Sequence, residues 1–132
     1  MRPAEIAVRY LEVLGGDDPD AVADLVADDF RNEHLSALGA ASTGRDEYRR
    51  RLPEFFANLS GRHYRLDDLL EADRGDHTDV VVRYRLTATV EGAPIDVPGM
   101  MWITVADGSI ARRIDAWDSL TVLRQTGATP DT

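Results

Sequence analysis

The feature that most constrains the fold is a change of hydrophobic periodicity near residue 63. Before it, apolar residues recur at steps of three and four, as in amphipathic helices. After it, they alternate with polar residues, as in strands. The alternation predicts four strands, at residues 63–73, 78–90, 95–106 and 109–117. The turns between them are short and contain glycine, two of them as E-G and D-G, so consecutive strands are expected to pair antiparallel.

The N-terminal half predicts three helices. Residues 3–14 carry one apolar stripe, and a second helix is expected after Asp18, a suitable N-cap, with a stripe that extends to Val26. A third helix is expected from about Asp46, and Pro53 should kink or divide it.

Three smaller features complete the pattern. Residues 29–35 predict a short strand or extended segment. Pro98-Gly99 predicts a bulge or bend in the third long strand. Residues 119–125 predict a short C-terminal helix, for which Asp118 is the expected N-cap.

These elements predict one α+β domain at residues 1–127, followed by a flexible tail at residues 128–132. A helical layer on one face of a curved sheet is the economical arrangement for this order of elements. The short turns leave no room for the crossovers that a parallel sheet needs, which excludes a doubly wound fold.

The composition narrows the chemistry. The chain has a net charge of -9, so nucleic acid and anionic membranes are poor partners. It has no cysteine and no lysine, which excludes thiolate nucleophiles, cysteine-bound metals and Schiff bases. The three histidines show no metal-binding spacing, and we expect neither a metal nor a cofactor. No export signal or membrane-length apolar run is present, which predicts a cytoplasmic protein.

Two longer motifs resemble a known family. They are R-Y-L-E-V-L-G-G-D-D-P-D-A-V-A-D-L-V-A-D-D-F, which starts at Arg9, and D-G-S-I-A-R-R-I-D-A-W-D-S-L, which starts at Asp107. Over about residues 5–127 the chain resembles the nuclear transport factor 2-like (cystatin-like) superfamily, and within it the SnoaL-like polyketide cyclase branch. The resemblance implies a cone, in which a curved antiparallel or mixed sheet wraps around three N-terminal helices. It also implies an apolar pocket for a small molecule and a homodimer.

The superfamily includes ketosteroid isomerases, epoxide hydrolases, polyketide cyclases, dehydratases and members without chemistry. Tyr10 matches the oxyanion tyrosine of the ketosteroid isomerases, but His34 stands where their catalytic aspartate would be. Their second oxyanion acid falls near Met100 or Met101, which cannot donate a useful hydrogen bond, so this activity is disfavoured.

The limonene-type epoxide hydrolases match only in part. Asp115 and Arg83 fit their first aspartate and their arginine, whereas Arg85 stands at their second aspartate. Their water-holding residues correspond to Asn32 and His34. The polyketide cyclases resemble the chain best, because they need a single acid/base aspartate on the last strand.

The alternation of side chains along a strand separates the two aspartates of I-D-A-W-D-S-L. Arg113, Asp115 and Trp117 should share one face, whereas Asp118 should point away from Asp115 and cap the next helix. If that face is the concave one, burial would raise the pKa of the Asp115 carboxyl and suit it to proton transfer near neutral pH. The structural alternative is an ion pair of Asp115 with Arg113 or Arg83.

His34 is the second candidate catalytic residue, as a proton partner or a donor to substrate. Tyr10 could bind a ligand carbonyl or could be an ordinary core tyrosine. The candidate substrate-binding residues are Tyr10, Asn32, Phe56, Arg83, Trp102 and Trp117.

Three functions remain open. The first is an enzyme that uses acid/base chemistry on an apolar metabolite with a carbonyl or epoxide, by cyclisation, isomerisation or hydrolysis. The second is a non-catalytic binder of an apolar ligand. The third is a dimeric interaction module that uses the outer face of the sheet.

Overall fold

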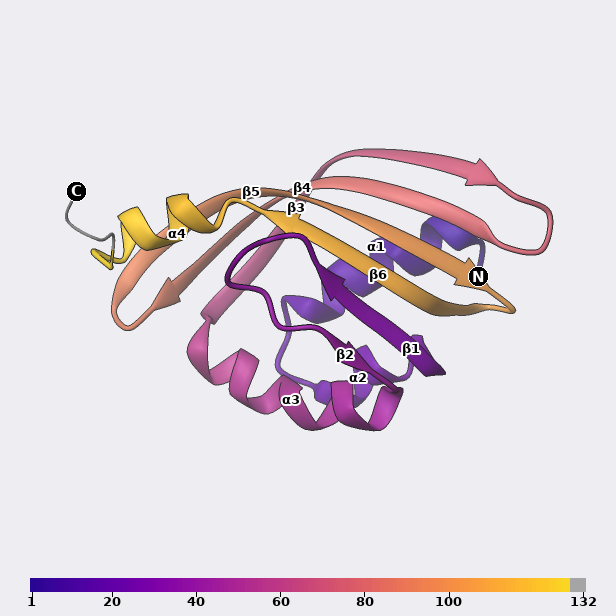
Figure 1. Cartoon of the computed structure of the whole chain (residues 1–132), viewed down its shortest axis with the longest axis horizontal. Coiled ribbons are helices and arrows are strands. Elements are labelled where there is room, and N and C mark those ends of the chain that lie inside the picture. Colours follow the sequence, from indigo (N-terminus) through magenta and orange to yellow (C-terminus); the bar gives the residue numbers. More distant parts are fainter. Residues whose placement is uncertain (129–132) are drawn as a thin grey trace.

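The computed structural model describes residues 1–128, and it shows a curved sheet with three helices on one side (Figure 1). The helices are α1 (Pro3–Leu14), α2 (Pro19–Ala23), α3 (Arg45–Asn58) and α4 (Ser119–Gln125). The strands are β1 (Val26–His34), β2 (Ser42–Thr43), β3 (Ser60–Asp73), β4 (Thr78–Val90), β5 (Ala93–Ala106) and β6 (Ser109–Trp117). The predicted α+β class and the short C-terminal helix are confirmed. Residues 129–132 of the predicted tail lie outside the described residues.

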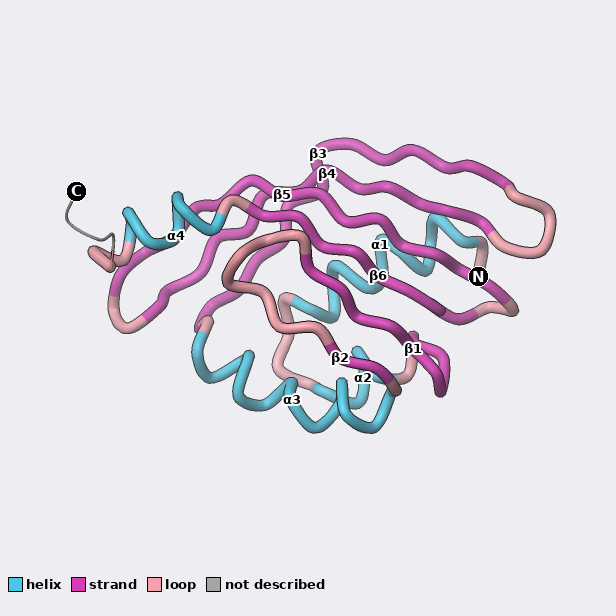
Figure 2. Tube along the Cα trace, viewed as in Figure 1, coloured by secondary structure: helices cyan, strands magenta, loops and turns pink. Residues whose placement is uncertain are grey.

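The six strands form one mixed sheet in the order β2-β1-β6-β5-β4-β3. The long strands β3 to β6 pair antiparallel in chain order, as their alternation and short turns predict (Figure 2). The turns Glu91-Gly92 and Asp107-Gly108 have positive φ at both residues, as a two-residue hairpin turn of this kind requires. Strand β1 lies parallel to β6, so the N-terminal half of the chain supplies an inner strand next to the one that carries Asp115.

Helix α1 covers the inner face of the sheet. Its stripe of buried residues includes Ile6, Tyr10 and Leu14, which pack in the main core with the inward-facing residues of β4 and β5. Because each strand alternates, Val80 and Val82 of β4 enter this core, whereas their neighbours face outward.

A buried arginine joins the ends of two helices to the sheet. The guanidinium of Arg62, on β3, donates to the carbonyl oxygens of Leu14 and Gly16 after α1 and to those of Phe56 and Leu59 at the end of α3. It also contacts the Phe56 ring, whose centroid lies 4.0 Å away. Carbonyl groups at helix ends lack partners within the helix, so Arg62 supplies the donors that they need.

Two helical predictions need correction. Helix α2 ends at Ala23, and Val26 begins β1, because Val26 pairs with Ile110 of β6 and this tertiary pairing overrides the helical spacing. The strand predicted at residues 29–35 is therefore longer. Helix α3 is not divided at Pro53, whose exposed position lets water reach the carbonyl group left without a donor. This overturns the predicted division, and the kink stays a prediction. The N-caps Asp18 and Asp118 are confirmed.

Of the bulge or bend predicted at Pro98-Gly99, the bulge is wrong, since β5 stays in unbroken register with β4 along its whole length. The bend stays a prediction. On its other side, β5 pairs with β6 only as far as Gly99 and Trp117. Pro98 therefore lies just beyond this pairing, so its lack of an N–H removes no hydrogen bond between β5 and β6.

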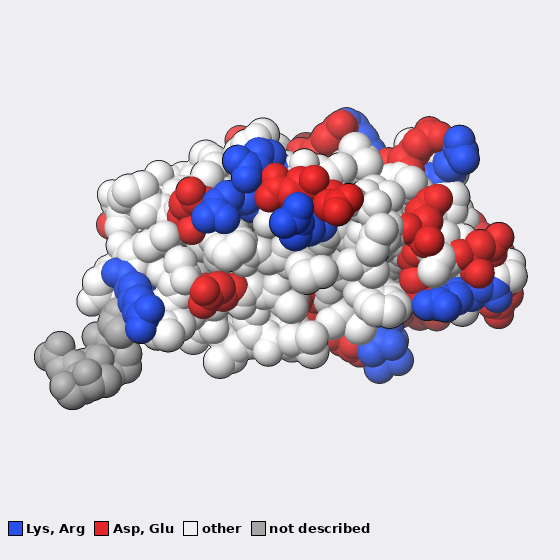
Figure 3. All heavy atoms as spheres, turned by 90° about the horizontal axis from the view of Figure 1, so that it is seen from above, with Lys and Arg blue, Asp and Glu red and all other residues white. Residues whose placement is uncertain are grey.

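The outer face of the sheet carries an apolar row. Leu70, Val81, Trp102 and Ile114 occupy consecutive register positions across β3, β4, β5 and β6. Leu70 and Trp102 are exposed. Seen from above Figure 1, charged side chains of both signs gather in groups and leave uncharged surface between them (Figure 3). Within residues 1–128, no helix has the length and apolar character needed to cross a membrane.

Candidate functional site

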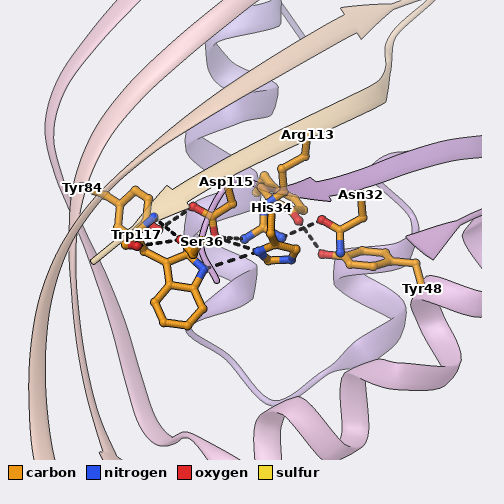
Figure 4. A network of polar contacts seen from close by, with 9 residues as sticks. Asn32, His34, Ser36, Tyr48, Tyr84, Arg113, Asp115 and Trp117 are labelled. Atoms are coloured by element: carbon orange, nitrogen blue, oxygen red, sulfur yellow. Dashed lines mark hydrogen bonds and ion pairs between the residues drawn. The ribbon is translucent and has the colours of Figure 1, made fainter. Parts of the chain in front are cut away.

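A cavity of about 360 Å³ lies between the concave face of the sheet and helix α3. Its apolar wall includes Leu14, Leu52, Phe55, Leu59, Leu86, Val90, Ile95, Val97 and Val122. Polar side chains gather on the part formed by β1 and β6, namely Asn32, His34, Arg113 and Asp115 (Figure 4). Arg51 of α3 also lines the cavity and is paired with Glu47. The cavity therefore combines a mainly apolar wall with a few polar groups, as small-molecule sites commonly do.

Strand β6 directs Asp115 into this cavity. Arg113, Asp115 and Trp117 all line it, as the alternation of the strand predicts. The side chain of Asp115 is only 6% exposed. Asp118 instead accepts a hydrogen bond from the backbone N–H of Thr121 and caps α4, so the two aspartates do not form a pair.

Two donors hold the Asp115 carboxylate. An Arg113 terminal nitrogen donates to Asp115 Oδ2 at 2.8 Å, and the Tyr84 hydroxyl donates to Oδ1 at 2.6 Å. The ion pair of Asp115 with Arg113, which was the predicted structural alternative to a catalytic role, is thus present. The cavity lies beside this pair. A buried carboxylate needs such partners, and their presence does not decide whether the carboxylate also meets a substrate.

Gly99 explains how Tyr84 reaches Asp115 from two strands away. Gly99 pairs with Tyr84 on β4 and with Trp117 on β6, so the tyrosine ring crosses β5 over this residue. A Cβ atom at position 99 would overlap the outer end of the Tyr84 ring and its hydroxyl. The glycine is therefore required for the close approach of the ring, and not for a bulge.

His34, at the end of β1, lies on the other side of Asp115. The Trp117 indole N–H donates to His34 Nδ1 at 3.4 Å, and Nδ1 lies 4.0 Å from Asp115 Oδ2. Burial and the positive charge of Arg113 lower the pKa of His34 to about 4, although the negative charge of Asp115 acts in the opposite direction. His34 is therefore an uncharged imidazole at neutral pH.

Arg113 connects these groups to Asn32. One terminal nitrogen donates to Asn32 Oδ1 at 2.9 Å and the other to Asp115, while Nε is buried and has no partner among residues 1–128. Both terminal nitrogens are thus engaged by side chains of the site.

All four tyrosines of the chain lie at or behind this cavity. Tyr48, Tyr64 and Tyr84 line it, and Tyr10 lies behind Tyr48 with the two hydroxyls hydrogen-bonded to each other. Burial raises the pKa of all four phenols, which are therefore protonated and able to donate at neutral pH.

A family model described as a SnoaL-like domain matches residues 7–113, which is most of the chain. The chain belongs to the SnoaL-like domain family. No curated protein matches it significantly.

Solved structures share the fold of this SnoaL-like protein. A hypothetical protein from Catenulispora acidiphila DSM 44928 with a ketosteroid isomerase-like fold, in complex with trimethylamine, is 25% identical, with a TM-score of 0.84 over 98% of this chain and 96% of that chain. A candidate SnoaL-like polyketide cyclase from Jannaschia sp. CCS1 is 22% identical, with a TM-score of 0.75 over 98% of both chains. A candidate polyketide cyclase from Bacillus cereus ATCC 10987 is 22% identical, with a TM-score of 0.76 over 95% of this chain and 80% of that chain. The SnoaL-like protein thus has a cyclase- or isomerase-type fold.

Several predicted site residues of this SnoaL-like protein come together. Asp115, His34, Asn32 and Trp117 all line the cavity. Tyr10 lies one layer behind it, which fits the core alternative for this residue.

Three other predicted residues lie outside the cavity, which corrects their expected place. Phe56 packs on Arg62, and its neighbour Phe55 takes the place in the cavity wall because adjacent helical residues point in different directions. Arg83 and Trp102 are exposed on the outer face of the sheet, since each alternates with inward-facing neighbours on its strand.

Sequence reasoning missed the contributions of Tyr48, Tyr64 and Tyr84 to the cavity. For Tyr84 a local signal existed, because it shares the inward face of its strand with Val80 and Val82. Its bond to Asp115 depends on strand order, which alternation does not reveal.

Proposed function

We propose that this SnoaL-like protein is an enzyme that needs no cofactor and transfers a proton on an uncharged, mainly apolar small molecule. Asp115 would act as the acid/base group, and His34 would polarise the reacting oxygen. The observation that carries the proposal is a buried carboxylate, oriented by Arg113 and Tyr84, at the wall of a mainly apolar cavity.

The chemistry of the polar cluster favours a carbonyl substrate over an epoxide. Asp115 is the one carboxylate in the cavity wall among the described residues, and Arg113 and the neutral Tyr84 phenol hold it. The neutral imidazole of His34 and the neutral phenols of Tyr48 and Tyr64 also line the cavity. A carboxylate can remove a proton next to a carbonyl while neutral donors stabilise the enolate oxygen. Cyclisation and isomerisation both proceed through such a step.

The test is exchange of the protons next to a carbonyl. We expect the protein to accelerate hydrogen–deuterium exchange of 1-tetralone in D₂O, followed by NMR, and Asp115→Asn to lower the rate by at least about 100-fold. Asp118→Asn, which removes a carboxylate from a helix cap only three residues away, is the matched control. Equal exchange rates in wild type and Asp115→Asn, with both proteins folded, would reject the role of Asp115.

A non-catalytic binder is the second candidate, because both oxygens of Asp115 already accept hydrogen bonds. In that case 1-tetralone would bind to wild type and to Asp115→Asn, and neither protein would accelerate exchange.

The trimethylamine held by the Catenulispora protein suggests an amine as another class of ligand. Arg113 lies beside Asp115 in this chain and opposes a second positive charge, so an uncharged ligand is favoured.

The predicted homodimer remains a proposal, and the apolar row on the outer face supports it. Trp102 at the centre of this row is 44% exposed, and Leu70 is 69% exposed. We expect light scattering to give twice the mass of one chain for wild type and a smaller mass for Trp102→Glu. A monomeric wild type at tens of micromolar would overturn this proposal.

A further inference from the structure

Among residues 1–128, the ring of His34 has a partner at only one of its two nitrogens. Trp117 Nε1 lies 3.4 Å from His34 Nδ1, and an indole N–H can donate but cannot accept. Nδ1 must then present its lone pair, which places the proton of the neutral ring on Nε2. Asp115 would favour a proton on Nδ1, but at 4.0 Å it is too distant for a hydrogen bond, and Arg113 and Tyr84 already satisfy it.

The second nitrogen is left for a ligand. His34 lines the cavity, and no group of residues 1–128 accepts a hydrogen bond from its Nε2. The lowered pKa of His34, about 4, keeps the ring uncharged at neutral pH, because burial and Arg113 both oppose protonation. Nε2–H is therefore an uncharged donor on a side chain that lines the cavity.

The surroundings restrict the ring to this orientation. The Ser36 hydroxyl donates to the Trp117 carbonyl oxygen at 2.6 Å and accepts from the Trp117 N–H at 2.8 Å, so the segment after β1 is tied to the end of β6. Gly39 packs so closely on His34 that a Cβ there would overlap the histidine side chain. Trp117 and His34 are thus held relative to each other by their own backbones.

The charges around His34 restrict the class of ligand. Within residues 1–128, the wall has two cations, and each already faces a carboxylate: Arg113 is paired with Asp115, and Arg51 with Glu47. A carboxylate or phosphate ligand would have to compete with these partners. A neutral donor in a mainly apolar cavity suits an uncharged molecule with an oxygen that only accepts.

We propose that His34 Nε2–H forms a subsite for the carbonyl oxygen of an uncharged ketone, and that Trp117 is a positioning residue that fixes the tautomer of His34. This subsite deepens the proposed function, on which it depends only for the chemical step that follows binding. It favours an uncharged ketone over carboxylates, phosphates and other anionic substrates.

The first experiment uses two probes that differ only at the oxygen. We expect His34→Phe to lower the affinity for 1-tetralone by about tenfold and to leave that for tetralin, which lacks the carbonyl, unchanged. His34→Gln, whose amide can donate, should recover part of the loss. The infrared carbonyl stretch of bound 1-tetralone should move to higher frequency in His34→Phe. Equal losses for both probes would overturn the subsite.

The second experiment observes the tautomer without any ligand. Nitrogen-15 NMR of the wild type should show His34 with its proton on Nε2, and Trp117→Phe should shift the ring towards a mixture of tautomers. A wild-type proton on Nδ1, or a Trp117→Phe spectrum identical to the wild type, would overturn the role of Trp117.

Failure of the subsite and failure of the proposed function are distinguishable. If 1-tetralone shows the predicted dependence on His34 but no exchange occurs, the subsite stands and the enzyme proposal fails. If exchange depends on Asp115 while His34→Phe binds both probes as wild type does, the enzyme proposal stands and the subsite fails.

Discussion

The protein buries two arginines, and they differ in what they bond. Arg62 donates to four backbone carbonyl oxygens at helix ends and also reaches Asp17. Arg113 donates to two side chains, Asn32 and Asp115, beside a cavity, and its Nε has no partner among residues 1–128.

The partners of each arginine indicate whether it is needed for the fold or belongs to the candidate site. Backbone carbonyls at helix ends need donors in any folded chain, so Arg62 has a complete structural explanation. Arg113 and its partners Asn32 and Asp115 could be replaced together by apolar residues at little cost in stability. Stability alone therefore does not explain why these polar residues are present. A buried charge whose partners are side chains lining a cavity therefore marks the candidate site.

The largest expected effect is the loss of stability on replacement of Arg62. Arg62→Met leaves four carbonyl oxygens without their donor, and we expect the free energy of unfolding to fall by about 3 kcal/mol or more. Chemical denaturation measures it. Arg62→Lys, which keeps the charge with fewer donors, should recover only part of the loss. A loss below about 1 kcal/mol would remove the contrast between the two arginines.

Replacement of Arg113 should affect stability less and the site more. We expect Arg113→Met to cost about 2 kcal/mol, because water from the cavity can reach the unpaired Asp115, and Arg113→Met with Asp115→Asn to recover most of this loss. Because the charge of Arg113 lowers the pKa of His34, the pKa should rise from about 4 towards its ordinary value in Arg113→Met. NMR titration of the His34 ring follows it, and an unchanged pKa would contradict the proximity effect.

Substitution of Gly99 tests the hydrogen bond by which Tyr84 holds Asp115. Gly99→Ala should displace the Tyr84 ring from Asp115, with a loss of about 1–3 kcal/mol in stability and of about tenfold in the exchange rate. Gly16→Ala is the control, because a Cβ there meets only one ordinary contact. In a Tyr84→Leu background the cost of Gly99→Ala should shrink, and equal costs in both backgrounds would show that the two residues are independent.

The smallest effect concerns pH. His34 has a pKa of about 4 in the folded protein against 6.5 for the free side chain, so between these values the unfolded chain binds a proton that the folded chain does not. Stability should therefore fall as the pH drops from about 6.5 to about 4, by no more than about 2 kcal/mol once solvent screening is considered. Urea denaturation of wild type and His34→Gln across this range should show a shallower fall in the variant.

Most of the fold was predictable because the relevant signals are local. The bounds of β4, β6 and α4 follow from alternation, from glycine turns and from the Asp118 cap, all of which act within a few residues. The error at Val26 arose because distant pairing decided the outcome, since this residue joins β6 and leaves the helical pattern.

The candidate site was predictable only in part, for the same reason. Asp115 and Trp117 follow from the alternation of one strand, whereas Phe55 replaces Phe56 through the rotation of a helix about its axis. Arg83 was predicted from its match to the epoxide hydrolases and Trp102 from its place on the third long strand, but their strands turn both side chains to the outer face.

The sequence by itself determined the order and type of the main elements and put Asp115 on one face of the last strand with Arg113 and Trp117, because periodicity reports which side chains share a face. Only the tertiary structure decided that this face is the inner one and what surrounds the carboxylate. Tyr84 arrives across β5 above Gly99, and His34 arrives from a parallel strand. Contacts between residues about 30 and about 80 positions apart depend on strand order and sheet curvature, which no local pattern encodes.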